Sequence, residues 1–112
     1  DIEQPMAAAF MVRSELLAEI DNMDERFRMF FNDVDLCRKI YYAGFKIKLL
    51  PSSVVIHEHG ASIKKDRSNM IKVWNIDCAK YFEKHFGKGL LLVWLKLNLK
   101  ISGIIRVLKK KK

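Results

Sequence analysis

Residues 32–36, Asn32-Asp33-Val34-Asp35-Leu36, set two carboxylates close together between an aromatic segment and apolar residues at helical spacing. This spacing predicts a helix from Asp33 to Ala43, with Gly44 as a left-handed C-terminal cap. Asn32 or Asp33 can cap the start of that helix. A cap explains one acid of the pair and leaves the other for chemistry.

The charge of the chain is concentrated at one end. The chain has 112 residues, half of them hydrophobic, which is enough for one core. Its formal net charge is +8, yet residues 1–87 are neutral, with 13 basic and 13 acidic side chains. All of the excess positive charge lies in the tail that begins at Lys88. We therefore expect an electrostatic partner at the tail, and no nucleic-acid partner, because the aromatic residues of the neutral part are not interleaved with Arg.

The two cysteines indicate the redox compartment of the protein, and the first residues indicate whether an upstream segment is expected. Cys37 and Cys78 each lie in an apolar, helix-like context and form no close pair, which predicts buried thiols in a reducing compartment. The chain opens without a signal peptide, and residues 1–5 are typical of entry from an upstream segment. We expect a piece of a longer protein.

Hydrophobic patterning predicts alternating helices and strands. Apolar runs or apolar alternation indicate short strands at 7–12, 45–49 and 54–56. Apolar residues at threes and fours indicate helices at 14–20, with Ser14 as a cap, and at about 69–86, closed by Gly87. The polar, basic residues 62–68 are expected to form a loop.

The tail is apolar but repeatedly interrupted by basic residues. Lys96, Lys100 and Arg106 break any run long enough to cross a bilayer easily. We expect a basic amphipathic helix that lies on an anionic membrane surface. The alternative is that its apolar face packs on a partner helix or on a part of the protein outside this chain. The residues expected to bind the membrane are Trp94, Lys96, Lys100, Arg106, Lys109 and Lys110.

Several motifs occur in an order that is more specific than any one of them. They are Ala7-Ala8-Ala9-Phe10-Met11-Val12-Arg13, Met23-Asp24-Glu25-Arg26-Phe27, Phe30-Phe31-Asn32-Asp33-Val34-Asp35-Leu36-Cys37, Ala43-Gly44-Phe45 and Val55-Ile56-His57-Glu58-His59-Gly60-Ala61-Ser62. From about Ala7 to about Gly87, this series resembles the C-terminal half of bacterial family-two glycosyltransferases, closest to the rhamnosyltransferase-like branch. The resemblance implies an α/β fold, the C-terminal portion of a GT-A fold with short strands and flanking helices. Residues 1–87 would then be the acceptor-side half of the domain, and residues 88–112 a helical tail.

The resemblance also implies a role for the acidic pair. The position of Asp33 is that of the family's catalytic base, which takes the proton from the acceptor hydroxyl. A helix N-terminus favours such an ionised carboxylate. Asn32 replaces a Glu that is usual in the family and would support the acceptor site. Asp35 is either a further supporting residue or, more simply, an acid that suits the first turn of a helix.

A metal and diphosphate site is expected beyond the strand predicted at 54–56. His57 matches a family histidine near the metal and diphosphate, with an ordinary loop histidine as the alternative. The metal would be Mg or Mn, held in the longer protein, since the family's metal-binding Asp-x-Asp lies upstream of the matched region. Lys64, Lys65 and Arg67 could neutralise the leaving diphosphate, or could simply be a solvated charge run.

The implied activity is that of the longer protein. It would transfer a sugar from a nucleotide-diphospho-sugar to a hydroxyl of a saccharide or lipid-linked acceptor, with inversion, in cell-surface polysaccharide or glycolipid synthesis at the cytoplasmic face of the membrane. The chain by itself would be inactive, would bind no cofactor tightly, and would form homo-oligomers that cover exposed sheet edges. The alternative is a non-catalytic module that binds a membrane surface or a protein through its basic tail.

Overall fold

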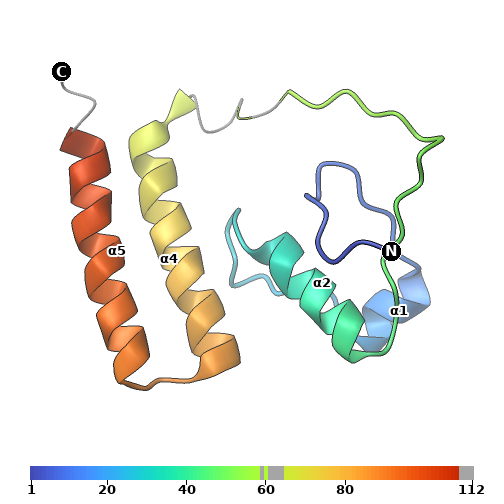
Figure 1. The fold of residues 1–112 in the computed structure, drawn as a ribbon, viewed down its shortest axis with the longest axis horizontal. Coiled ribbons are helices and arrows are strands. Elements are labelled where there is room, and N and C mark those ends of the chain that lie inside the picture. Colours follow the sequence, from blue (N-terminus) through green and yellow to red (C-terminus); the bar gives the residue numbers. More distant parts are fainter. Residues whose placement is uncertain (59, 61–64, 109–112) are drawn as a thin grey trace. The chain divides into compact units, whose positions relative to one another are not determined.

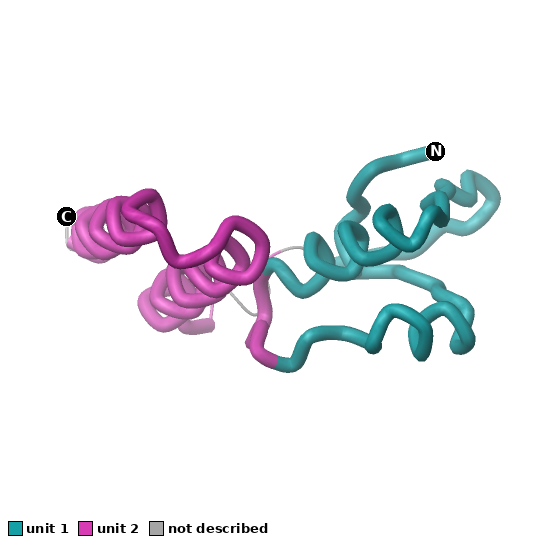
Figure 2. Tube along the Cα trace, turned by 90° about the horizontal axis from the view of Figure 1, so that it is seen from below, with its two compact units in different colours: residues 1–25, 31–59 teal, residues 26–30, 60–112 magenta. Residues whose placement is uncertain are grey.

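The computed structural model describes residues 1–58, 60 and 65–108. Within these ranges four helices are found and no strand: α1 (Ser14–Glu19), α2 (Asn32–Tyr42), α4 (Arg67–Phe86) and α5 (Leu90–Leu108) (Figure 1). The chain forms two compact units, shown in different colours in Figure 2. The α1–α2 unit comprises residues 1–25 and 31–59, and the α4–α5 unit comprises residues 26–30 and 60–112.

The expected α/β architecture is wrong for the described residues, which are all-α. The segments 7–12, 45–49 and 54–56 were predicted as strands, but the only strand-like pairing described is one antiparallel bridge between Ile2 and Ile47. The apolar alternation at 45–49 has another cause. Phe45 and Ile47 pack on helices, while the lysines between and after them are exposed. One-sided burial therefore produces the alternation without a hydrogen-bonded ladder.

The core of the α1–α2 unit lies where its two helices meet. Leu16 of α1 packs with Leu36 and Ile40 of α2, and all three are less than one-tenth exposed. Partly buried apolar residues complete this cluster: Phe10, Val12, Leu17, Ile20, Phe45 and Ile47. Burial of these side chains, at about 25 cal/mol per Å² of apolar surface, holds the short helices in place.

The end of α2 follows the predicted pattern. Gly44 has a φ of 80° and its N–H donates to the carbonyl of Tyr41 at 3.0 Å, which confirms the left-handed turn. Lys39, in the last turn, donates through Nζ to the carbonyls of Asp21 and Asn22, at 3.2 and 2.9 Å. These two bonds connect α2 to the turn that follows α1.

The α4–α5 unit is built on a helical hairpin. The Asp66 side chain caps α4 by accepting from the N–H of Asn69 at 3.1 Å, and Gly87, at a φ of 83°, ends the helix. After a short connection α5 packs back along α4 (Figure 1). Asn75 of α4 donates through Nδ2 to the carbonyl of Leu99 at 2.8 Å, at the point where Gly103 lets the helices approach closely.

The helix expected in the tail is present as α5, and a helix was correctly expected over most of α1, α2 and α4. In the part of the chain that the structure describes, no helix is both long and apolar enough to cross a membrane.

Candidate functional site

The first turn of α2 carries Asp33, the predicted catalytic base, and the predicted supporting residues Asn32 and Asp35. The helix begins at Asn32, and the residue before it, Phe31, is the N-cap with φ 65° and ψ −4°. This is the left-handed region, which a bulky non-glycine residue adopts at a cost of about 1 kcal/mol or more. Strained residues of this kind cluster at functional sites, where the surrounding structure holds them.

The side chains of Asn32 and Asp33 each accept a hydrogen bond from the amide of the next residue. Asn32 Oδ1 accepts from the N–H of Asp33, and Asp33 Oδ1 accepts from the N–H of Val34, each at 2.8 Å. Each of these bonds goes only to the amide of the next residue, and the N-cap position is Phe31, which makes no side-chain capping bond, so the prediction that Asn32 or Asp33 is the capping residue is wrong. Asp33 is half-buried. Its carboxylate is therefore partly shielded from water but still accessible to a ligand.

Asp35 lies in a different environment from Asp33. It is 1% exposed, and its backbone N–H donates to the carbonyl of Phe31 at 2.8 Å. A carboxylate buried to this degree belongs to the interior of the protein. The two acids of the motif are therefore divided between the interior and the partly accessible first turn of α2.

Cys37 lies one helical turn after Asp33. Burial raises the pKa of the Cys37 thiol, and the negative charge of Asp33 adds to this rise because it disfavours a thiolate nearby. Burial alone raises the pKa of Cys78 on α4. Both thiols are buried and unpaired by disulfides. The Asp33 carboxylate thus acts electrostatically along its own helix face.

An anchor for the aromatic segment before α2 was missed from the sequence. Asp77 of α4 is 0% exposed, and its Oδ2 accepts from the N–H groups of Met29 and Phe30, each at 3.1 Å. The other oxygen, Oδ1, is buried and finds no hydrogen-bond partner among the residues that the structure describes. The signal was available: Asp77 stands between Val73 and Tyr81 on the apolar repeat of α4, where an acid needs a partner.

Further contacts hold the same segment on α4. Phe27 is 6% exposed, and its ring lies 6.5 Å from that of Tyr81 and 5.7 Å from the ammonium of Lys84. Lys80 donates through Nζ to the carbonyl of Arg26. Residues 26–30 are therefore fixed to α4 by both apolar and polar contacts, and the strained Phe31 follows directly.

The residues expected to contact metal and diphosphate are solvent-exposed where they are described. His57 lies in an extended segment of the α1–α2 unit, while Lys65 and Arg67 belong to the α4–α5 unit. Lys64 lies outside the described residues. Within the described ranges no three His, Cys, Asp or Glu side chains come together as metal ligands would. His57, Lys65 and Arg67 thus do not by themselves form a metal site.

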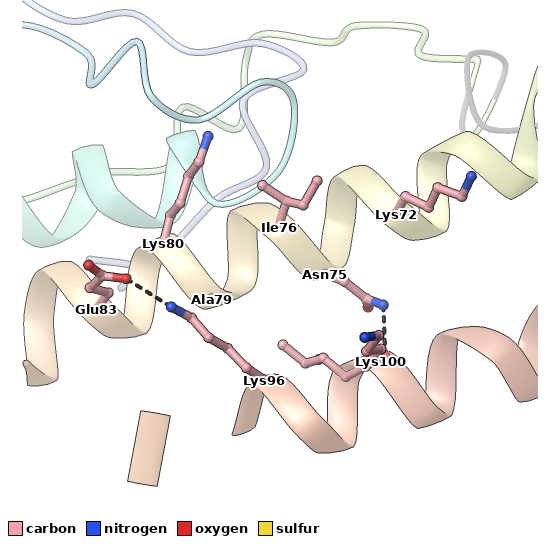
Figure 3. A pocket seen from close by; sticks show the side chains of 9 residues that line it. Lys72, Asn75, Ile76, Ala79, Lys80, Glu83, Lys96 and Lys100 are labelled. Carbon is pink, nitrogen blue, oxygen red and sulfur yellow. Dashed lines mark hydrogen bonds and ion pairs between the residues drawn. The ribbon is translucent and has the colours of Figure 1, made fainter. Parts of the chain in front are cut away.

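An open hollow of about 520 Å³ lies between α4 and α5 (Figure 3). It falls within the size range of small-ligand sites. Four of its nine lining side chains are lysines and one is an acid: Lys72, Lys80, Lys96, Lys100 and Glu83. Hydrogen bonds from Lys96, at 3.1 Å, and from Lys88 hold the pKa of the Glu83 carboxyl below its ordinary value. The hollow is therefore basic overall.

The residues expected to bind a membrane occupy different faces of α5. Trp94 is 62% exposed, and Lys100 is exposed at the edge of the hollow. Lys96 pairs with Glu83, and the guanidinium of Arg106 lies 5.7 Å from the ring centre of Trp74 on α4. Lys109 and Lys110 lie outside the described residues.

In comparisons with protein-family models, curated proteins and solved structures, no match to this chain was found. Any assignment to a family therefore rests on the motifs in the sequence.

Proposed function

We propose that this chain supplies the acceptor side and the catalytic base of a bacterial inverting glycosyltransferase of the rhamnosyltransferase-like kind. The observation that carries the proposal is the half-buried Asp33 carboxylate in the first turn of α2, directly after a strained Phe31. The ordered series of motifs around it supports the same reaction. The donor would be a nucleotide-diphospho-sugar, and the acceptor a saccharide or lipid-linked hydroxyl.

In the proposed reaction Asp33 takes the proton of the acceptor hydroxyl. The acceptor oxygen then forms a bond to the anomeric carbon from the face opposite the diphosphate, while the bond between that carbon and the diphosphate oxygen breaks. The electron pair leaves with the nucleoside diphosphate, and the configuration of the sugar is inverted. A positioned carboxylate of this kind contributes about 10²- to 10⁴-fold to the rate.

The test is the variant Asp33→Asn in the longer protein that contains this chain and a donor-binding segment. We expect sugar transfer to fall by about 100-fold or more, since the amide cannot accept the proton, while binding of nucleoside diphosphate is retained. Glu19→Gln, at the exposed end of α1, removes the same charge away from the site and should leave transfer unchanged. Undiminished transfer by Asp33→Asn would refute the base assignment.

The proposed location is the cytoplasmic face of the cell membrane, where the basic tail would meet anionic lipid. Residues 88–112 contain eight basic side chains and no acidic one, which favours such a surface. The product would then be a cell-surface polysaccharide or glycolipid. A non-catalytic membrane- or protein-binding module is the second candidate, favoured by the exposed apolar residues of α5. Loss of sugar transfer in the Asp33→Asn variant would support the enzyme and exclude the non-catalytic module.

A further inference from the structure

One face of α5 is an unbroken line of exposed apolar side chains. The positions recur at intervals of four and three residues, so they lie one above another along the helix. Each is more than half exposed: Leu90, Trp94, Leu97, Ile101, Ile104 and Leu108. We call these six residues the apolar stripe.

The apolar stripe is not the face of α5 that packs on α4. The buried residues of α5 are Leu92, Leu99 and Gly103, and the carbonyl of Leu99 accepts the hydrogen bond from Asn75 of α4. On a helical wheel these residues lie on the side opposite the stripe. The hairpin therefore buries one face of α5 against α4. The opposite face, the apolar stripe, has no packing partner among the described residues of this unit.

The basic hollow borders the apolar stripe. Lys100 follows Leu97 by three residues and precedes Ile104 by four, which places it on the flank of the stripe. Across the hollow, α4 contributes Lys72, which is exposed, whereas the ammonium of Lys80 points away from α5 and donates to the carbonyl of Arg26 (Figure 3). An apolar surface bordered by ammonium groups, with Trp94 within it, is the composition of a helix that lies in a bilayer interface.

We propose that the apolar stripe inserts into the interface of an anionic lipid bilayer while the lysine-lined hollow between α4 and α5 holds lipid headgroup phosphates. This inference rests on the proposed membrane location and identifies the surface that meets the lipid. Charge complementarity selects the occupant. A second copy of the chain would bring its own basic flank against this one and repel it, whereas anionic headgroups attract both.

The geometry divides the basic residues of α4 and α5 near the hollow between two tasks. Lys96 is paired with Glu83 and Arg106 lies over Trp74, so both stabilise the hairpin. Lys100 and Lys72 are also exposed at the hollow, and these are the ammonium groups with which a headgroup phosphate would pair. Insertion of the stripe to the depth of its side chains leaves α4 and this basic edge at the level of the headgroups.

Vesicle sedimentation of the full 112-residue chain tests the proposal. The vesicles contain either phosphatidylcholine alone or equal parts of phosphatidylcholine and phosphatidylglycerol. We expect strong binding only to the anionic vesicles. Leu97→Ser/Ile101→Ser should weaken it by on the order of 100-fold, through lost apolar insertion. The control Val54→Ser/Ile56→Ser removes two even more exposed apolar side chains, in the α1–α2 unit, and should bind like the wild type.

The headgroup site has its own pair of variants. Lys72→Gln/Lys100→Gln should weaken binding to anionic vesicles by about 30-fold, which corresponds to about 1 kcal/mol for each lysine near the surface. Lys46→Gln/Lys48→Gln removes the same charge from exposed positions of the other unit and should have little effect. Equal losses from both pairs would show that net charge alone attracts the chain, and would overturn the headgroup site.

Tryptophan fluorescence identifies the inserted face. Anionic vesicles carrying brominated lipid should quench the emission of the wild type, and Trp94→Phe should abolish this quenching while Trp74→Phe retains it. If the wild type binds but the serine variant of the stripe binds equally well, the inserted surface is wrong and the membrane location stands. If the wild type does not bind anionic vesicles, the inserted surface and the membrane location are both wrong. In that case, a dimer that sedimentation equilibrium detects for the wild type but not for the serine variant would identify a second copy of the chain as the occupant of the apolar stripe.

Discussion

The Oδ2 atom of Asp77 accepts a hydrogen bond from the backbone N–H of Phe30 at 3.1 Å, across 47 residues of sequence. The same oxygen accepts from the neighbouring amide of Met29. These bonds fix residues 29 and 30 to α4, and the next residue in the chain, Phe31, has a left-handed φ. Asp77 thus anchors residues 29 and 30 to α4 within the α4–α5 unit.

Removal of the Asp77 carboxylate should destabilise the protein more than its single negative charge suggests. Asp77→Ala leaves two backbone N–H groups without their acceptor, and we expect the free energy of unfolding to fall by about 3 kcal/mol. Asp77→Asn keeps one carbonyl oxygen in place and should lose about half as much. Urea denaturation followed by circular dichroism measures both values.

Asp66→Ala provides the comparison for Asp77. Asp66 is also an acceptor on α4, but it is exposed and bonds only to the local amide of Asn69. Its removal should cost about 1 kcal/mol, the usual value for an N-cap. Equal losses for Asp66→Ala and Asp77→Ala would mean that the bonds to Met29 and Phe30 contribute nothing beyond local helix stability.

A second prediction concerns the close approach of α4 and α5. In a helix, Ala is favoured over Gly by about 1 kcal/mol. At Gly103, however, an added Cβ would lie 2.7 Å from Nδ2 of Asn75, which donates to the carbonyl of Leu99. Gly103→Ala should therefore destabilise the hairpin by about 1 to 2 kcal/mol, because the displaced Asn75 loses its hydrogen bond in a partly buried site.

A double-mutant cycle separates the clash from the helix propensity of Ala. In an Asn75→Ala background the nearest remaining neighbour of the added Cβ is Cγ2 of Ile71, at the ordinary contact distance of 3.8 Å, so Gly103→Ala should become neutral or stabilising. The change of sign, measured as thermal unfolding of the two single variants and the double variant, is the expected result. If Gly103→Ala destabilises the protein equally in both backgrounds, the destabilisation does not come from a clash with Asn75.

The helices could be predicted from the sequence because their signals are local. Apolar residues at threes and fours mark α2 and α4, and Gly44 and Gly87 adopt the positive φ that ends them. The predicted strands failed for a physical reason. The alternation around Phe45 and Ile47 reports that one side of the segment is buried, and side chains on α1 and α2 bury it without a second strand.

The candidate site was only partly readable for a similar reason. The position of Asp33 at a helix start follows from its neighbours in the sequence. An aromatic residue gives no sign of a left-handed φ, so the strain at Phe31 could not be foreseen. The bonds from Asp77 to Met29 and Phe30 depend on tertiary packing, which no local pattern encodes.

A third prediction uses Cys37 as a reporter of the charge on Asp33. The Asp33 carboxylate is one of the causes that raise the pKa of the Cys37 thiol, after burial. Asp33→Asn should therefore lower that pKa. The pKa of Cys78, which burial alone raises, should stay where it is and serves as the internal control. NMR of isotope-labelled cysteine titrates both thiols in one experiment, and an equal shift at the two thiols would mean a general loosening of the protein.

The raised pKa values of Cys37 and Cys78 also predict how the stability of the protein changes with pH. Each thiol holds its proton more tightly in the folded than in the unfolded protein. Below the ordinary thiol pKa of about 8.5, both states keep the thiols protonated, so these groups cause no pH dependence there. As the pH rises above it, the unfolded protein loses protons first, and the free energy of unfolding falls until the folded thiols also ionise. Asp33→Asn should reduce the part of this alkaline loss that comes from Cys37. Urea denaturation of the wild type and the variant across this pH range measures the difference, and a larger alkaline loss in the variant would contradict the proximity of the two charges.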